Sequence, residues 1–173
     1  MKIACIVTNG FEDSELRIPV DRLRQSGHQV DIISFEKGDP LAGYKGKEKV
    51  TSDKGIDEVK AADYDALLIP GGHSPDKLRA DKRFVELVKA FDKAGQLIAA
   101  VCHGPQILLT AELVTGRKLT AWSTVQGDLR QAGANVEDTE VVVDRNWITS
   151  RKPGDLEIFS RTFVEKLSQL PRK

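Results

Sequence analysis

The chain has few cysteines, few histidines and no excess of charge of either sign. Its 173 residues include two cysteines and three histidines, and 26 lysines and arginines balance 26 aspartates and glutamates. Cys5 and Cys102 are too few for the disulfide framework of a small secreted protein. A chain with balanced charge and no basic run lacks the electrostatic signature of nucleic-acid binding. We therefore expect a cytoplasmic, reduced protein with no nucleic-acid partner.

Long apolar runs and cofactor motifs are also missing. No stretch of the sequence approaches the roughly 18 apolar residues of a membrane span. Acidic residues directly follow the short apolar stretch near the N-terminus, unlike the pattern of a signal peptide. The sequence contains neither the Cys-x-x-Cys nor the His-x-x-x-His spacing of zinc ligands, and no glycine-rich or Walker nucleotide motif. We expect no membrane partner, no metal and no cofactor.

Short β-branched runs alternate with longer amphipathic stretches along the chain. The pattern predicts buried strands over 2–8, 29–35, 65–72 and 96–102. It predicts helices over 14–27, 75–95, 104–113, 123–133 and 154–170, with Ser14 and Ser123 as N-caps and a break near Asp81. Between these lie an excursion of short strands or turns over 36–59, a short strand over 118–122 and a hairpin over 140–150.

Such alternation determines the expected fold class. Near-continuous apolar strands separated by helices are typical of a parallel sheet that is covered on both faces. The sequence shows no internal repeat, linker or low-complexity segment. We expect a single α/β domain over residues 1–173, with a mostly parallel sheet between layers of helices and a small hairpin near the C-terminus.

Reactive and flexible residues gather where three of the predicted strands end. Ligands of parallel α/β sheets bind at the carboxyl ends of the strands, because these ends meet at one edge of the sheet. The residues at these ends are Glu12, the turn formed by Gly71, Gly72 and His73, and the pair Cys102 and His103. Their convergence is the strongest functional signal in the sequence, and it predicts an active site.

Cys102 lies where a predicted strand becomes a helix. This position is typical of a nucleophile elbow, which presents a side chain above the sheet edge. Amides at the N-terminus of the following helix favour the thiolate, so we expect a lowered thiol pKa. The alternatives are an inert buried residue, a redox thiol and a ligand of an improvised metal site with His73 and His103.

Acyl transfer also needs donors for an oxyanion and a base beside the nucleophile. The amides of His103 and of the Gly71–Gly72 turn are the candidate donors. Adjacent residues on a helix do not face each other, so a contact between Cys102 and His103 depends on a strained turn. His73 is the rival base at this edge. Glu12 is the candidate carboxyl for a hydrogen bond to the Cys102 sulfur.

Four segments of the sequence form a set that spans nearly the whole chain in order. They are GFEDSEL, DALLIPGGHSPDKLR, AAVCHGPQIL and VVVDRNWITSRKPGDL. Together they resemble the ThiJ/PfpI superfamily, and specifically its PfpI-type branch. The resemblance implies a flavodoxin-like three-layer sandwich, similar in fold to class I glutamine amidotransferase domains. It implies that Cys102 is the nucleophile, that His103 is its catalytic partner and that Glu12 hydrogen-bonds the thiol.

The resemblance also implies a site that is shared between subunits. In the PfpI-type branch an acid from the neighbouring subunit completes a triad, and the matching position here is Asp76, where the archaeal proteases of the branch have glutamate. Such a site lies at an interface, so the resemblance implies a homodimer or a dimer-based hexamer. Amidotransferases complete their triad with a downstream His-x-Glu pair, and no histidine follows His103 in this chain.

Members of this superfamily are described as intracellular peptidases, as deglycases acting on methylglyoxal or glyoxal adducts, and as cofactor-free glyoxalases. Each activity needs an activated thiol that attacks an electrophilic carbon. We expect a stress-protective cysteine hydrolase whose Cys102 attacks a carbonyl or carbinol carbon of a peptide, a glycated protein or a small dicarbonyl adduct. The alternative is a redox-sensing or chaperone-like stress protein, in which Cys102 is oxidised rather than turned over.

Overall fold

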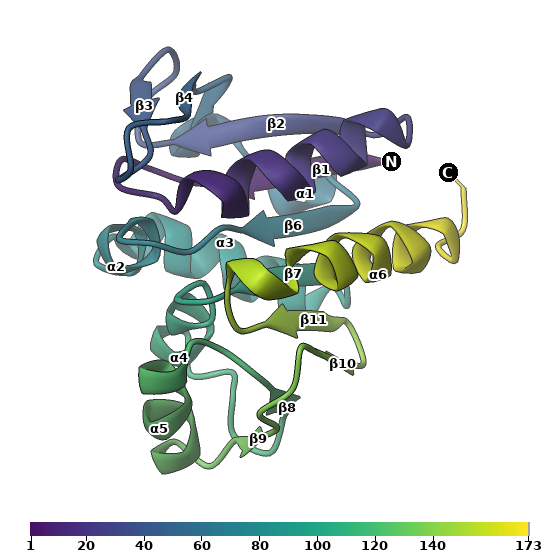
Figure 1. Ribbon diagram of the computed structural model, residues 1–173. Coiled ribbons are helices and arrows are strands. Elements are labelled where there is room, and N and C mark those ends of the chain that lie inside the picture. Colours follow the sequence, from purple (N-terminus) through teal and green to yellow (C-terminus); the bar gives the residue numbers. More distant parts are fainter. Residues whose placement is uncertain (173) are drawn as a thin grey trace.

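The computed structural model describes residues 1–172 and is built around a seven-stranded sheet (Figure 1). The strand order is β10-β11-β7-β6-β1-β2-β5. The strands are β1 (Lys2–Ile6), β2 (Gln29–Ser34), β5 (Lys54–Gly55), β6 (Ala66–Ile69), β7 (Leu97–Val101), β10 (Val141–Asp144) and β11 (Trp147–Ser150). Neighbouring strands are parallel except β10 and β11, which form an antiparallel hairpin at one edge.

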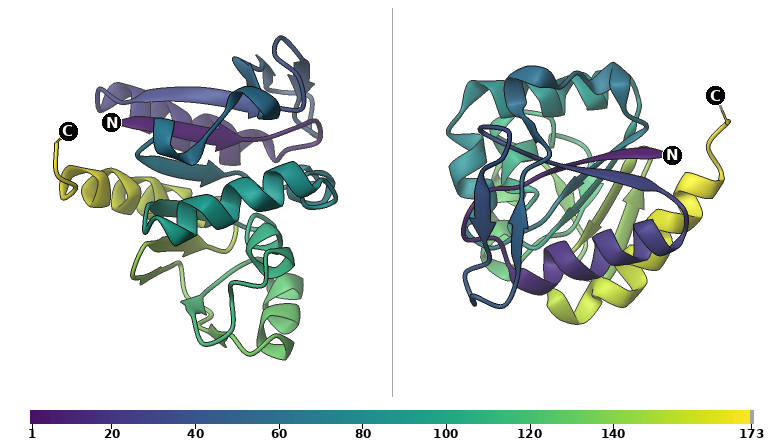
Figure 2. Two further views of the ribbon diagram at one scale, coloured as in Figure 1. Left: turned by 180° about the vertical axis from the view of Figure 1, so that it is seen from behind. Right: turned by 90° about the horizontal axis from the view of Figure 1, so that it is seen from above.

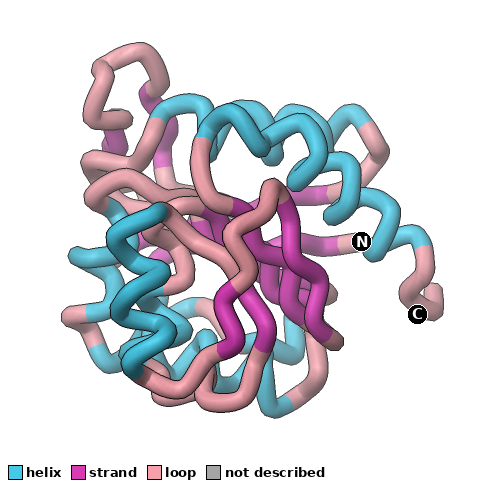
Figure 3. Tube along the Cα trace, turned by 60° about the horizontal axis from the view of Figure 1, so that its bottom comes forward, coloured by secondary structure: helices cyan, strands magenta, loops and turns pink. Residues whose placement is uncertain are grey.

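Helices cover both faces of this sheet, as Figures 2 and 3 show. On one face α1 (Asp13–Gln25) packs beside α6 (Leu156–Ser168). The apolar core on the other face receives side chains from α2 (Ser74–Arg79), α3 (Lys82–Lys93), α4 (Gln106–Thr110) and α5 (Ser123–Gln131). The predicted α/β sandwich, with a mostly parallel sheet and a small hairpin near the C-terminus, is therefore confirmed.

The central strands are apolar throughout because both of their faces are covered. Every residue of β6 and of β7 is buried. Along β7, Ile98 and Ala100 enter the core beneath α3, whereas Ala99 and Val101 enter the core beneath α1 and α6. The two-residue period of a strand thus fills two cores at once, which removes any polar alternation from the sequence.

Two small sheets and three 3₁₀ turns complete the described chain. The predicted excursion contains an antiparallel hairpin of β3 (Pro40–Ala42) and β4 (Lys49–Thr51). β8 (Lys118–Leu119) pairs with β9 (Asn135–Val136) in parallel. The 3₁₀ turns are Ile56–Glu58, Ala61–Asp63 and Pro153–Asp155. Within residues 1–172, the helices are all too short or too polar to cross a bilayer.

Two helix starts differ from the prediction, and one predicted break is confirmed. Glu12 caps α1 with its carboxylate, whereas Ser14 lies inside the helix and donates its hydroxyl to Glu12. The larger acid already satisfies the free amide, so the serine is not needed as a cap. Trp122 occupies the N-cap position of α5, and Ser123 is the first helical residue. The break near Asp81 is present, because Asp81 caps α3.

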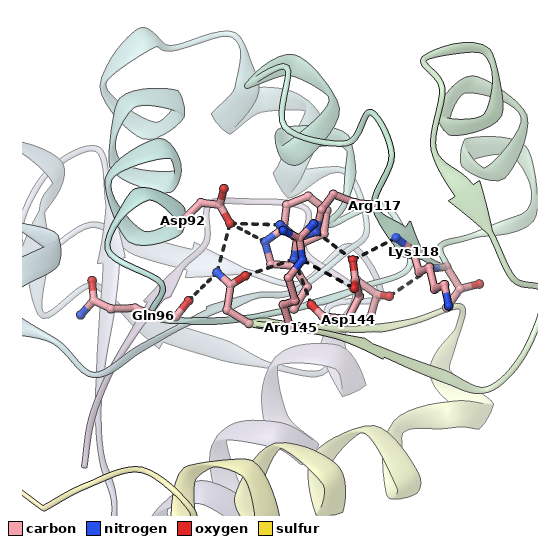
Figure 4. Close-up of polar contacts among 10 residues, drawn as sticks. Asp92, Gln96, Arg117, Lys118, Asp144 and Arg145 are labelled. Atoms are coloured by element: carbon pink, nitrogen blue, oxygen red, sulfur yellow. Dashed lines mark hydrogen bonds and ion pairs between the residues drawn. The ribbon is translucent and has the colours of Figure 1, made fainter.

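A buried charge network joins α3 to the turn between β10 and β11 (Figure 4). The guanidinium of Arg117 donates to Asp144 at 2.8 Å, lies 3.5 Å from Asp92 and stacks 3.7 Å above the centre of the Trp147 ring. Asn146 accepts from the same guanidinium and donates to Asp92. The single cation therefore holds two acids of different elements in place at the amino ends of β7 and β11.

Candidate active site

Cys102 stands at the sharp turn between β7 and α4. Its φ of 63° lies in the left-handed region, which costs a residue other than glycine about 1–3 kcal/mol. The Cys102 amide donates to the Ser150 carbonyl at 3.0 Å, and the Trp122 amide donates to the Cys102 carbonyl at 2.9 Å. Neighbouring segments thus hold the strained residue from both sides, and only 6% of it is exposed.

His103 reaches the thiol although it is the next residue in the chain. Its Nδ1 lies 3.3 Å from the Cys102 Sγ, a contact that depends on the left-handed turn. The imidazole also stacks on the Trp122 ring, with ring centres 6.2 Å apart. Burial, and after it repulsion from His73, lowers the pKa of His103. The imidazole is therefore neutral at about pH 7 and can accept a proton.

The carboxyl that contacts the thiol is Glu15, in the first turn of α1. Its side chain is fully buried beside the Cys102 thiol, and the ionisation of each group affects that of the other. Its Oε1 accepts the Gly71 amide at 3.0 Å. Burial, and after it the charge of Glu12, raises the pKa of Glu15 to about 8. Glu15 is therefore protonated at neutral pH, and its hydroxyl can donate to the sulfur.

The structure corrects the predicted role of Glu12 at the thiol. The Glu12 carboxylate accepts the Glu15 amide at 3.0 Å and the Ser14 hydroxyl, and it lies 2.8 Å from Lys45 Nζ. Burial opposes its charge, but these hydrogen bonds outweigh burial and lower the pKa of Glu12. Glu15 lies three places further along the helix and on the same face as Glu12, but its direction towards the thiol depends on where α1 begins.

Gly71 and Gly72 bring the backbone close to the thiol. A Cβ at Gly71 would lie 2.3 Å from Glu15 Oε1 and 2.8 Å from the Cys102 Cβ, so a larger residue does not fit. The Gly71 amide is bound to Glu15, which removes it from the predicted oxyanion donors. The amides of Gly72 and His103 act on the sulfur instead, and they favour its charged form. Their role as oxyanion donors stays a prediction.

The resting thiol is harder to ionise than its position at a helix start suggests. Burial, and after it the charge of Glu15, raises the pKa of Cys102, and the amides of His103 and Gly72 oppose this only in part. Protonation of Glu15 removes the opposing charge and supplies a donor in its place. Cys102 and Glu15 therefore titrate as a coupled pair, and the thiolate forms most easily when the acid holds the remaining proton.

A cavity of about 500 Å³ opens beside Cys102 and joins all three predicted strand ends. His73 lies in its wall and contacts the ring of Tyr44 edge to face, with ring centres 5.4 Å apart. Tyr44 is half exposed and comes from the loop between β3 and β4, which sequence patterns did not connect with the site. The rest of the wall includes Glu12, Glu15, Gly72, Asp76, His103, Gln106, Trp122 and Pro153.

Asp76 lies on α2 at this cavity. Its side chain is 66% exposed and pairs with Arg79 at 2.9 Å within the same chain. The charge of Asp76 opposes the burial that lowers the pKa of His103. Its predicted contact with a neighbouring subunit stays a prediction. In the described part of the chain, no three His, Cys, Asp or Glu side chains are placed to hold a metal ion.

Comparison with known proteins relates this arrangement to a family. A model of the DJ-1/PfpI family matches residues 1–166. The chain is 50% identical over 167 residues to protein/nucleic acid deglycase 2 of Escherichia coli (strain K12). That alignment covers 96% of this chain and 97% of the relative. It is 47% identical over 169 residues to general stress protein 18 of Bacillus subtilis (strain 168). That alignment covers 97% of this chain and 98% of the relative.

A solved structure shows the same fold. A two-domain protein of Anabaena variabilis, containing DJ-1/ThiJ/PfpI-like and ferritin-like domains, matches 99% of this chain with a TM-score of 0.95 and 37% sequence identity. This chain spans 50% of that two-domain protein. The family model covers nearly all of the sequence, and the two bacterial relatives align along almost their whole lengths. The chain belongs to the DJ-1/PfpI family.

Proposed function

We propose that the chain is a cofactor-independent, cytoplasmic cysteine hydrolase with Cys102 as its nucleophile. The observation that carries the proposal is a strained thiol held between a protonated acid, Glu15, and a neutral base, His103. Its substrates are peptides or the dicarbonyl adducts of proteins and small molecules. The name of the Escherichia coli relative, a deglycase, supports the adducts, and that of the Bacillus subtilis relative supports a role in stress.

The reaction begins when His103 accepts the thiol proton and the Cys102 sulfur attacks the substrate carbon. With an amide, the attack places negative charge on the carbonyl oxygen, where the amides of Gly72 and His103 can donate to it. With a carbinol adduct, the C–S bond forms as the C–N bond breaks. In both cases the amine leaves with the proton from His103. Water then releases the remaining group from the sulfur.

The experiment compares wild type with Cys102→Ala and Cys5→Ala. The substrates are methylglyoxal-modified N-acetylated amino acids and a fluorogenic peptide. We expect Cys102→Ala to lose turnover, whereas Cys5→Ala keeps it, because Cys5 lies in the core of β1 away from the cavity. Equal rates for wild type and Cys102→Ala on both kinds of substrate would rule out the hydrolase.

We further propose that the chain acts as a homodimer or a dimer-based hexamer in which Asp76 of a neighbouring subunit orients His103. The exposure of Asp76 at the cavity supports this, because its side chain remains available to a second chain. Light scattering should then report an oligomer. Asp76→Asn should lower kcat while the oligomer persists. A monomeric active enzyme, or unchanged kcat in Asp76→Asn, would contradict the shared triad.

Oxidation of Cys102 is the second candidate function. The specific observation in its favour is the set of donors around the sulfur, namely Glu15 and the amides of Gly72 and His103, which suits an oxidised, negatively charged sulfur. Intact mass after mild peroxide treatment measures this. Oxygen adducts confined to Cys102 support a redox role, and their absence under conditions that oxidise free thiols excludes it.

A further inference from the structure

A second acid, Glu12, lies beside the coupled pair of Glu15 and Cys102. Glu12 carries a negative charge, whereas Glu15 carries a proton. Glu12 is only 3% exposed, yet it receives Lys45 Nζ at 2.8 Å, the Glu15 amide at 3.0 Å and the Ser14 hydroxyl. The Glu15 carboxyl receives one amide, from Gly71, at 3.0 Å. Because their partners are so unequal, Glu12 holds the charge and Glu15 holds the proton.

The loop between β3 and β4 holds Lys45 in its place. Asp13 accepts the amides of Lys45, Lys47 and Glu48 at distances between 2.8 and 2.9 Å. A Cβ at Gly43 would lie 2.3 Å from the Asp13 carboxyl, so glycine is needed for this approach. The loop is thereby bound to the start of α1. Its lysine is a preorganised part of the site rather than a freely moving surface cation.

We propose that Glu12 and Lys45 are positioning residues, whose fixed ion pair keeps the shared proton on Glu15 and so leaves Cys102 as the group that ionises. The inference rests on the proposed hydrolase, because it concerns the activation of the same thiol. Glu12 precedes Glu15 by three residues and its charge acts on Glu15, whereas Glu15 is the carboxyl beside the sulfur. Lys45 keeps the buried Glu12 ionised.

The remaining titratable groups of the site are His103, which contacts the sulfur, and the groups that act on His103. From the turn before α4, His103 contacts the sulfur at 3.3 Å. His73, Asp76 and Arg79 act on His103 from α2 and the turn before it. These groups are the same in every variant described below. A change that follows alteration of the ion pair is therefore due to the ion pair.

The test measures the rate of Cys102 alkylation by iodoacetamide against pH, between about pH 5 and about pH 10. Cys5 is fully buried, so alkylation of the folded protein reports Cys102. The midpoint of the profile reports the loss of the first proton from the coupled pair. The height of the plateau reports how often the remaining proton is on Glu15 rather than on the sulfur.

We expect opposite shifts when the two members of the ion pair are neutralised. Glu12→Gln removes a negative charge, so the midpoint falls by about one pH unit and the plateau falls several-fold, because Glu15 now ionises in place of the thiol. Lys45→Gln removes a positive charge, so the midpoint rises. The double variant Glu12→Gln with Lys45→Gln returns the midpoint towards that of the wild type, because the two charge changes cancel.

Two control variants separate this effect from general changes of charge. Lys47→Gln removes the same charge from the same loop without removing the Lys45 contact to Glu12, and we expect the wild-type profile. Lys45→Arg keeps the cation and should also keep the profile. Thermal unfolding confirms that each variant is folded. If Glu12→Gln does not fold, the comparison of Lys45→Gln with Lys47→Gln decides, since both replace exposed side chains.

An unmoved midpoint in both single variants overturns the proposal, and so does a shift in the same direction in both. An equal shift in Lys47→Gln overturns it as well, because the effect is then one of general surface charge. The alkylation assay needs no substrate, so its outcome is independent of turnover. If the wild type turns over no substrate but the two single variants still shift the alkylation midpoint in opposite directions, the hydrolase proposal fails and the positioning role stands.

Discussion

Glu15→Gln should make the protein more stable, and increasingly so as the pH rises. The folded chain holds the Glu15 proton to at least about pH 8, whereas an ordinary glutamate releases it near pH 4.5. Between these values the folded state binds a proton that the unfolded state has lost, so the stability of the wild type falls as the pH rises. Glutamine does not titrate, and it keeps an acceptor for the Gly71 amide and a donor for the sulfur.

The size of the gain follows from the two pKa values. Each pH unit between them costs the wild type about 1.4 kcal/mol of unfolding free energy. The advantage of Glu15→Gln is therefore close to zero at pH 4.5 and grows to about 5 kcal/mol at pH 8. Whole domains are stable by about 5–15 kcal/mol, so the difference is a large and measurable fraction.

Urea denaturation followed by circular dichroism, at intervals between about pH 5 and about pH 9, measures this difference. Glu86→Gln is the matched control, because Glu86 is an exposed residue of α3 whose contact is a surface ion pair with Lys89 at 3.5 Å. The control should change the unfolding free energy by less than about 0.5 kcal/mol at every pH. An advantage of Glu15→Gln that is the same at all pH values would refute a protonated Glu15 in the folded chain.

Two further substitutions test the packing of the site and of the charge network. Gly71→Ala should slow the alkylation of Cys102 at neutral pH roughly tenfold or more, because the new Cβ would lie 2.3 Å from Glu15 Oε1 and displace the acid. Mass spectrometry measures the alkylation rate. A rate equal to that of the wild type would contradict the role of Glu15. Arg117→Met should lower the unfolding free energy by about 1–3 kcal/mol, because two partly buried aspartates lose their cation. Arg145→Met, at a side chain that is 70% exposed, is its control, and equal losses in urea denaturation would show that burial of the network is unimportant.

Much of the fold could be predicted because burial on both faces of a strand leaves a direct trace in the sequence. β6 and β7 are apolar at every position, and each fills two cores. The hairpin of β3 and β4 leaves no such trace, because its strands have three residues each and are largely exposed. Its place is determined by Asp13, which binds three amides of its loop from more than thirty residues away.

The candidate site could be predicted only in part, for reasons that lie in α1. Cys102 was accessible to prediction because the end of a buried strand is easy to recognise. Glu15 was not, because its direction depends on where α1 begins. The helix starts at Asp13, one residue before the prediction, with Glu12 as its cap. That start turns Glu15 towards the thiol, and Gly71, fifty-six residues later, leaves room for it.

Three acids within four residues then acquire two different protonation states from the partners that they meet. Asp13 accepts three loop amides and Glu12 accepts a cap amide and a lysine, so both hold a charge. Glu15 meets one amide and the sulfur in a fully buried place, so it holds a proton. Local sequence does not distinguish these acids, because each partner comes from another part of the chain. The reactivity of Cys102 is therefore determined at the start of α1 as much as at its own strained turn, and the same elbow without Glu15 would present a thiol without its proton donor.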